Sequence, residues 1–107
     1  MARYLIRARY TAEGTKGLIK GGGGTARRKA VQELISSAGG EMESFYWALG
    51  DDDAYVTVQL PDNVSAAAVS LAVNQVGAVT IKTTPLLTAE ELDQASRKSL
   101  NYRAPGQ

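Results

Sequence analysis

The residue types that normally carry out catalysis near neutral pH are scarce in this chain of 107 residues. It contains no histidine and no cysteine, so it lacks the side chain best suited to proton transfer at neutral pH and the usual ligands of zinc. Acid–base catalysis would depend on a carboxylate, a tyrosine or a lysine activated by burial, with Asp53 and Lys82 as candidates. We therefore expect no catalytic residue, no metal site and no cofactor, and we favour a non-catalytic protein.

Three consecutive aspartates at 51–53 could in principle bind a metal ion. Carboxylate oxygens suit hard cations, but consecutive side chains point in different directions and no glutamate follows at calcium-loop spacing. Aspartate is also favoured in turns, because its side chain can accept hydrogen bonds from nearby backbone amides. We therefore predict a hairpin turn here, which includes Gly50 and Asp53.

Four consecutive glycines at 21–24 could contribute to an anion site. They precede a segment that carries Arg27, Arg28 and Lys29, and glycine amides at a helix N-terminus can bind anions. A P-loop would need a lysine directly before Thr25, and a glycine stands there instead. A flexible connection is the favoured interpretation.

The elements that would position these residues follow from hydropathy patterns and turn residues. Strands are expected at residues 3–10, 41–49, 54–60 and 79–84, and residues 11–24 are expected to form turns. Helices are expected at residues 26–38, 64–76 and 89 to about 99. Thr25 is the predicted N-cap of the first helix, and Thr88 and Glu91 form a capping box before the third. Pro61 and Pro85 should end the last two strands.

The order of these elements predicts one α+β domain with a ferredoxin-like βαββαβ topology. A four-stranded antiparallel sheet would carry two helices on one face, followed by a C-terminal helix. The domain is expected to span residues 1–99, and residues 100–107 form a C-terminal tail. The other sheet face would be uncovered in a single chain.

The uncovered face is the predicted functional surface. Alternation in the strands places Arg7, Tyr55 and Lys82 on it. The strand at 41–49 is apolar on both sides, so either Phe45 and Trp47 or Met42 and Tyr46 could join them, and we prefer the first pair. A ligand site is therefore predicted at Arg7, Trp47, Tyr55 and Lys82. The favoured alternative is an oligomer interface, to which the residues assigned are Phe45, Trp47, Leu49 and Tyr102.

Several short motifs follow one another along the chain: Phe45-Tyr46-Trp47, Leu49-Gly50, Asp53, Pro61-Asp62 and Leu87-Thr88-Ala89-Glu90-Glu91. Taken in this order, they resemble the GYD-domain family of small bacterial proteins. Gly50 and Asp53 fit the Gly-Tyr-Asp pattern, whereas Asp52 stands where the tyrosine would be. The resemblance implies a fold of the dimeric α/β-barrel type and no assigned biochemical activity.

Charge and hydropathy indicate the partners and the compartment. Residues 1–29 hold eight basic residues and one acidic residue, although the net charge is only +1. Such an asymmetric chain could attract anions or copies of itself. The sheet lacks a ribonucleoprotein signature and carries three aspartates beside it, which argues against nucleic acid. No apolar run is long enough to span a membrane, and no signal peptide follows Met1, so we expect a cytoplasmic location.

Two functions remain open at this stage. The first is a homo-oligomer, with a dimer as its basic unit, that acts as a non-catalytic or small-molecule-binding accessory protein. The second is a cofactor-independent enzyme of the dimeric α/β-barrel type that acts on a small aromatic or carbonyl compound. In either case the small molecule would be anionic or aromatic, because the predicted surface combines rings with cationic side chains.

Overall fold

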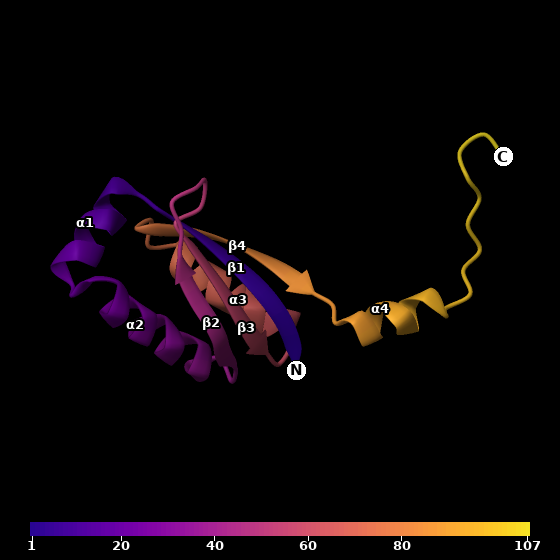
Figure 1. Cartoon of the computed structure of the whole chain (residues 1–107), viewed down its shortest axis with the longest axis horizontal. Helices are drawn as coiled ribbons and strands as arrows, with labels where there is room; N and C mark the ends of the chain where they lie inside the picture. Colours follow the sequence, from indigo (N-terminus) through magenta and orange to yellow (C-terminus); the bar gives the residue numbers. More distant parts are fainter.

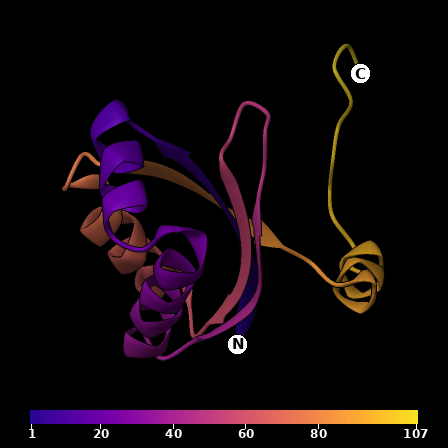
Figure 2. The same cartoon turned by 60° about the vertical axis from the view of Figure 1, so that its left-hand side comes forward.

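A four-stranded antiparallel sheet organises the structure, a computed structural model that describes residues 1–107. The elements in chain order are β1 (Ala2–Tyr10), α1 (Ala12–Lys20), α2 (Gly23–Ser37), β2 (Glu41–Trp47), β3 (Ala54–Leu60), α3 (Asn63–Asn74), β4 (Val79–Leu86) and α4 (Ala89–Ser96). The strand order is β2-β3-β1-β4, so β1 pairs with β3 and β4. This confirms the predicted α+β, ferredoxin-like fold. The helices α1, α2 and α3 lie on one side of the sheet (Figures 1 and 2).

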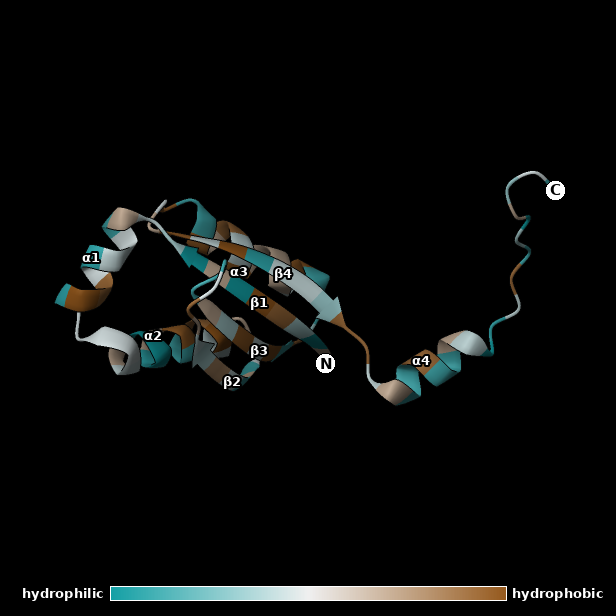
Figure 3. Cartoon of the chain, turned by 45° about the horizontal axis from the view of Figure 1, so that its top comes forward, coloured by the Kyte–Doolittle hydropathy of each residue, from teal (hydrophilic) through white to brown (hydrophobic).

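The core lies between the sheet and the two long helices, and the strand alternation explains its composition. Tyr4, Ile6 and Ala8 of β1 are buried, as are the alternate residues of β3 from Ala54 to Leu60. Figure 3 shows the resulting bands of hydrophobic and hydrophilic residues along the strands. The core cluster is completed by Ile35 of α2, Ala66 and Val69 of α3, and Val79 and Ile81 of β4. The inward faces predicted for β1, β3 and β4 are therefore confirmed.

Two helix starts follow the local sequence. The Asp62 side chain accepts a hydrogen bond from the Ser65 amide at 2.8 Å, which caps α3. Thr88 and Glu91 form both hydrogen bonds of the predicted capping box. The prediction of Thr25 as the N-cap of α2 is wrong, because α2 begins at Gly23, three residues before the predicted start, and Gly22 is its N-cap. Gly22 has a φ of 106°, a conformation that glycine adopts without strain, and no side chain caps this helix.

The prediction of turns throughout residues 11–24 is also wrong, since α1 occupies most of that segment. Thr11 caps α1 by accepting a hydrogen bond from the Gly14 amide at 3.1 Å. Two glycines within the helix lower its intrinsic propensity, which explains why the sequence pattern did not predict it. The glycine run still separates α1 from α2, at Gly21 and Gly22.

The strand β4 continues through Pro85 to Leu86, two residues beyond the predicted end. Pro85 is paired with Tyr4 of β1. Because β4 is an edge strand, its outer side has no neighbour to receive amide hydrogen bonds, and proline is tolerated there. The similar prediction for Pro61 is confirmed, because β3 ends at Leu60.

The last nineteen residues form an arm that extends away from the sheet and its helices (Figure 1). The arm consists of α4 and the residues after it, and no residue of α4 is buried. The molecule is correspondingly elongated, with extents of 58, 32 and 23 Å along its principal axes. None of its helices combines the length and apolar character needed to cross a membrane.

Candidate functional site

A bulge in β2 decides which aromatic side chains reach the uncovered sheet face. Met42 pairs with Val58 and Phe45 pairs with Val56, so both lie on the helix side of the sheet. In a regular strand, positions 42 and 45 would point to opposite faces, because they are an odd number of residues apart. They share a face here because the register shifts between Met42 and Ser44. The preference for Phe45 and Trp47 on the uncovered face is therefore wrong.

Trp47 lies on the helix side at the end of β2, opposite the buried Ala54. Its ring centroid is 5.2 Å from that of Phe45 and 5.5 Å from that of Tyr10. The α2 backbone approaches the indole closely at Gly24, where an added Cβ would lie 2.6 Å from Trp47 Nε1. The indole thus lies between the sheet and α2 with 39% of the residue exposed, and the absence of a side chain at position 24 makes room for it.

The uncovered face, called the open face below, carries a row of four side chains across all four strands. Strand register aligns Tyr46 of β2 with Tyr55 of β3, Tyr55 with Arg7 of β1, and Arg7 with Lys82 of β4. The structure therefore brings together three of the four predicted ligand-site residues, Arg7, Tyr55 and Lys82. Tyr46 takes the position predicted for Trp47, and its exposed fraction is 69%. The alternation pattern had offered Tyr46 as the second choice.

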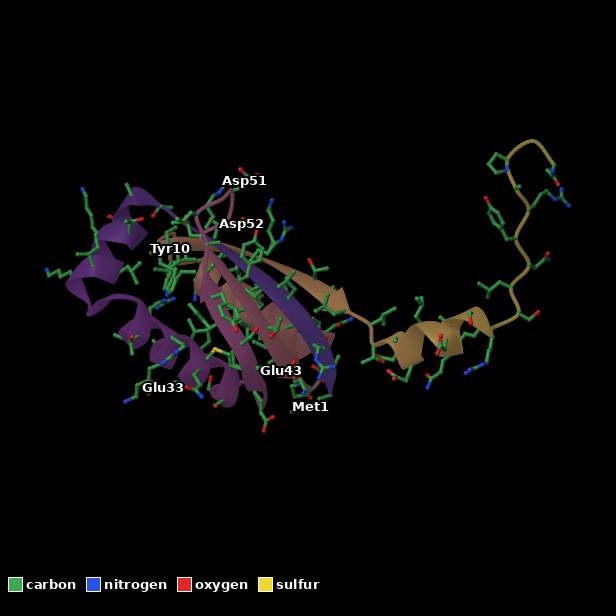
Figure 4. The ribbon with its side chains drawn as sticks, viewed as in Figure 1. Met1, Tyr10, Glu33, Glu43, Asp51 and Asp52 are labelled. Atoms are coloured by element: carbon green, nitrogen blue, oxygen red, sulfur yellow. The ribbon has the colours of Figure 1, made fainter.

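The β2–β3 loop, residues 48–53, contacts two arginines of β1 through Asp51 and Asp52, which Figure 4 labels in the loop. Asp52 Oδ2 lies 3.5 Å from an Arg7 terminal nitrogen. Arg9 donates two hydrogen bonds to the Asp51 carbonyl oxygen, at 3.0 and 2.8 Å. The loop is thereby fixed to one end of the open face, and Asp52 neutralises part of the positive charge of the row.

Asp53 has a different environment from the two aspartates before it. Its amide donates to the Ala8 carbonyl at 2.8 Å, and its carboxylate accepts a hydrogen bond from the Tyr10 amide at 2.8 Å. These bonds continue the pairing of β1 beyond the start of β3. Gly50 and Asp53 both lie in the β2–β3 loop. The structure contains no cluster of acidic side chains that could hold a metal ion.

The other end of the open face is held by a charged group. Arg3 donates two hydrogen bonds to the Glu43 carboxylate, at 2.7 and 3.0 Å, and Gln59 donates a third at 3.1 Å. The hydrogen bonds from Arg3 and Gln59 lower the pKa of Glu43 to about 2, and the pKa of Arg3 is raised by the same partner. Figure 4 shows Glu43 far from Asp51 and Asp52 along the strands. Between these two ends of the open face lie the row of four side chains and the half-buried Leu5.

The residues predicted for an oligomer interface are dispersed within one chain. Phe45 packs against the core, and Trp47 lies between the sheet and α2. Leu49 is fully exposed in the β2–β3 loop, and Tyr102 is 78% exposed in the C-terminal arm. Any interface that includes Leu49 and Tyr102 must therefore combine separate parts of the molecule.

Comparison with known proteins identifies a family. The model of the GYD domain matches residues 4–96, a range that begins in β1 and ends at the last residue of α4. No curated protein and no solved structure matches the chain. Because the match includes every strand of the sheet and all four helices, the chain belongs to the GYD domain family.

Proposed function

We propose that this GYD-domain protein is a self-assembling, non-catalytic accessory protein whose open face is covered by a second copy of the chain. The observation that carries the proposal is the row on the open face, in which Tyr46 and Tyr55 are adjacent and both exposed. Ordinary surfaces rarely expose neighbouring large rings on a rigid sheet without a partner. Within one chain these rings stay uncovered, because α1, α2 and α3 lie on the other side of the sheet and the C-terminal arm extends away from it.

The row is complementary to itself. Across the sheet it reads Tyr46, Tyr55, Arg7 and Lys82, two rings followed by two cations. A two-fold axis through its centre would place each ring of one copy opposite a cation of the other, and cations bind favourably to aromatic faces. Covering the exposed parts of the two rings would contribute a few kcal/mol per copy at about 25 cal/mol per Å².

The C-terminal arm supports the same proposal. Leu92, Leu100 and Tyr102 expose 61%, 83% and 78% of their surface, and none of them packs against the hydrophobic core. Figure 2 shows the arm on the opposite side of the sheet from α1, α2 and α3. A second copy seated on the open face would be within reach of an arm that leaves in this direction.

The test compares two matched substitutions by sedimentation at micromolar concentration. Leu5→Asp places a charge on the open face, whereas Leu71→Asp places the same charge on α3, where Leu71 is already 72% exposed. We expect the wild type and Leu71→Asp to sediment as dimers or larger species and Leu5→Asp as a monomer of 11.3 kDa. Circular dichroism would verify that all three are folded. A wild-type protein that sediments as a monomer would refute the proposal.

The enzymatic alternative, a cofactor-independent enzyme for a small aromatic or carbonyl compound, finds no specific support in these contacts. Asp53 uses its carboxylate for a backbone hydrogen bond, and Lys82 is exposed rather than activated by burial. A small anionic or aromatic ligand at Arg7, Tyr55 and Lys82 remains compatible with self-assembly, because a dimer would enclose this row between its two sheets.

A further inference from the structure

A cavity of about 440 Å³, open to solvent on one side, lies on the helix side of the sheet, away from the open face. It is bounded by α1, by one face of α2 from Gly23 to Leu34, by the end of α3, and by the end of β1 and the start of β4. Most of its lining is apolar, including Leu18, Leu34, Val73 and Val79. Its volume falls within the range of about 300–1,000 Å³ that is usual for small-molecule sites.

The way in which α1 is attached explains why this space is unfilled. At its start, the Thr11 amide and hydroxyl both donate to the Ala78 carbonyl oxygen, at 3.1 and 3.0 Å. Gly14 packs directly on the same carbonyl group and is the only buried residue of α1. The helix therefore covers the gap between α2 and α3 without inserting a large side chain into the core. Apolar walls that lack contacts on one side lose dispersion energy, which a ligand could restore.

The cavity also contains one oriented cationic group, Arg27 of α2. The side chain is half-buried, and its Nε donates a hydrogen bond to the Tyr10 hydroxyl at 3.2 Å. Its two terminal nitrogens have no hydrogen-bond partner in the protein, and Arg27 forms no ion pair. A guanidinium presents a fixed fork of donors that matches a carboxylate. Arg27 therefore has the geometry to bind an anionic group inside an apolar space.

The charge around the cavity favours an anion over a cation. Residues 11–29, which form α1 and the first part of α2, contain five basic residues and one acidic residue. That acid, Glu13, also borders the cavity, but it is exposed and makes no ion pair with Arg27. The less exposed of the two charged groups is thus the cation, and its two free terminal nitrogens favour an anionic partner.

We propose that this cavity binds a small amphipathic carboxylate. Its apolar part would contact Leu34, Val73 and Val79, and its carboxylate would accept hydrogen bonds from Arg27. This ligand site lies on the other side of the sheet from the proposed assembly surface, so the inference extends beyond self-assembly and does not depend on it. Occupation would also link α1 to α2 and α3 through the ligand, and would stabilise the folded state by mass action.

The protein carries its own reporter for the test. Trp47 is the only tryptophan, and its ring packs on Tyr10, which lines the cavity and holds Arg27. Octanoate and 1-octanol, which have equal chain lengths but different head groups, would be titrated while the Trp47 fluorescence is recorded. We expect octanoate to bind at least tenfold more tightly than 1-octanol.

Three variants separate the head-group contact from the cavity. Arg27→Met should weaken octanoate binding at least tenfold and leave 1-octanol binding within twofold. Arg28→Met removes an equal charge from the neighbouring, exposed residue and should change neither affinity by more than twofold. Gly17→Leu, at a cavity position where an added Cβ meets no atom within 4 Å, should weaken both ligands because the side chain competes for the space.

The outcomes are decisive in both directions. If Arg27→Met unfolds, as judged by circular dichroism, then the Gly17→Leu result decides the matter. The proposal is overturned if the wild type does not respond to octanoate up to millimolar concentration, if 1-octanol binds equally well, or if Gly17→Leu binds octanoate like the wild type. The same samples would be sedimented, so a failure of the ligand site is distinguishable from a failure of self-assembly.

Discussion

Replacing Gly14 with alanine is expected to destabilise the protein by forcing α1 away from the start of β4. An alanine Cβ at this position would lie 1.9 Å from the Ala78 carbonyl oxygen, whereas ordinary contacts begin near 3.4 Å. The helix would have to move by about 1.5 Å, and backbone atoms on both sides leave no flexible side chain to absorb the shift. The two hydrogen bonds from Thr11 to the same oxygen would be strained by that movement.

The size of the effect follows from three contributions. Alanine gains about 1 kcal/mol over glycine in a helix. Overpacking typically costs about 1–3 kcal/mol, and weakening two hydrogen bonds costs about 1 kcal/mol each. The net loss for Gly14→Ala is therefore about 2–4 kcal/mol in the free energy of unfolding.

Gly17→Ala is the matched control, because it adds the same methyl group to the same helix. An added Cβ at Gly17 meets no atom within 4 Å, so the helix gain of about 1 kcal/mol should remain. Since 1 kcal/mol shifts Tm by roughly 4–8 °C in a small domain, Gly14→Ala should melt at least about 10 °C below Gly17→Ala. Thermal unfolding would be followed by circular dichroism at several fixed protein concentrations, because assembly also affects Tm. Equal melting temperatures for the two variants would refute the assigned contact between Gly14 of α1 and Ala78, the residue before β4.

Three further predictions concern charge, ligand binding and assembly. Glu43 has a pKa of about 2 in the folded protein against an ordinary value of 4.5, mainly because of the hydrogen bond from Arg3. Its contribution to stability should be complete above pH 4.5 and lost as the pH falls toward 2, so the Tm difference between the wild type and Glu43→Gln should shrink over that interval. A constant Tm difference would contradict the lowered pKa of Glu43. If the open-face row binds small aromatic anions, Arg7→Met and Lys82→Met should each abolish the thermal stabilisation by benzoate. Arg27→Met, on the other side of the sheet, should retain it. A wild-type protein that benzoate does not stabilise would leave no support for that site. Deletion of residues 100–107 should weaken assembly in sedimentation but leave the circular dichroism spectrum of the folded sheet unchanged, and an unaltered oligomer would exclude a role for the tail.

Features that depend on neighbouring residues in the chain could be predicted from the sequence. The inward faces of β1 and β3 follow from a period of two, because alternate side chains of any strand point to opposite sides. The caps at Asp62 and Thr88 follow from side chains that bond amides three residues away. The topology also follows, since few arrangements can bury the apolar faces of these elements together.

The candidate site could be predicted only in part, for a reason that β2 illustrates. Its alternation gave two possible orientations, and the bulge after Met42 combines parts of both. A bulge arises from pairing with β3, so its position depends on a partner strand that lies beyond the hairpin loop. For this reason the sequence predicts the correct face for Arg7, Tyr55 and Lys82. It wrongly places Trp47 on the open face, where the structure has Tyr46.

The helix α1 and the cavity beneath it were decided by tertiary structure alone. The sequence by itself determined that residues 11–24 contain a glycine-rich break, because glycine disfavours a continuous helix wherever it occurs. It could not determine that Gly14 would meet the Ala78 carbonyl, sixty-four positions along the chain, and that this contact would hold a helix over an unfilled space. Local propensity depends on adjacent residues, whereas close approach and cavities depend on which distant surfaces the fold brings together.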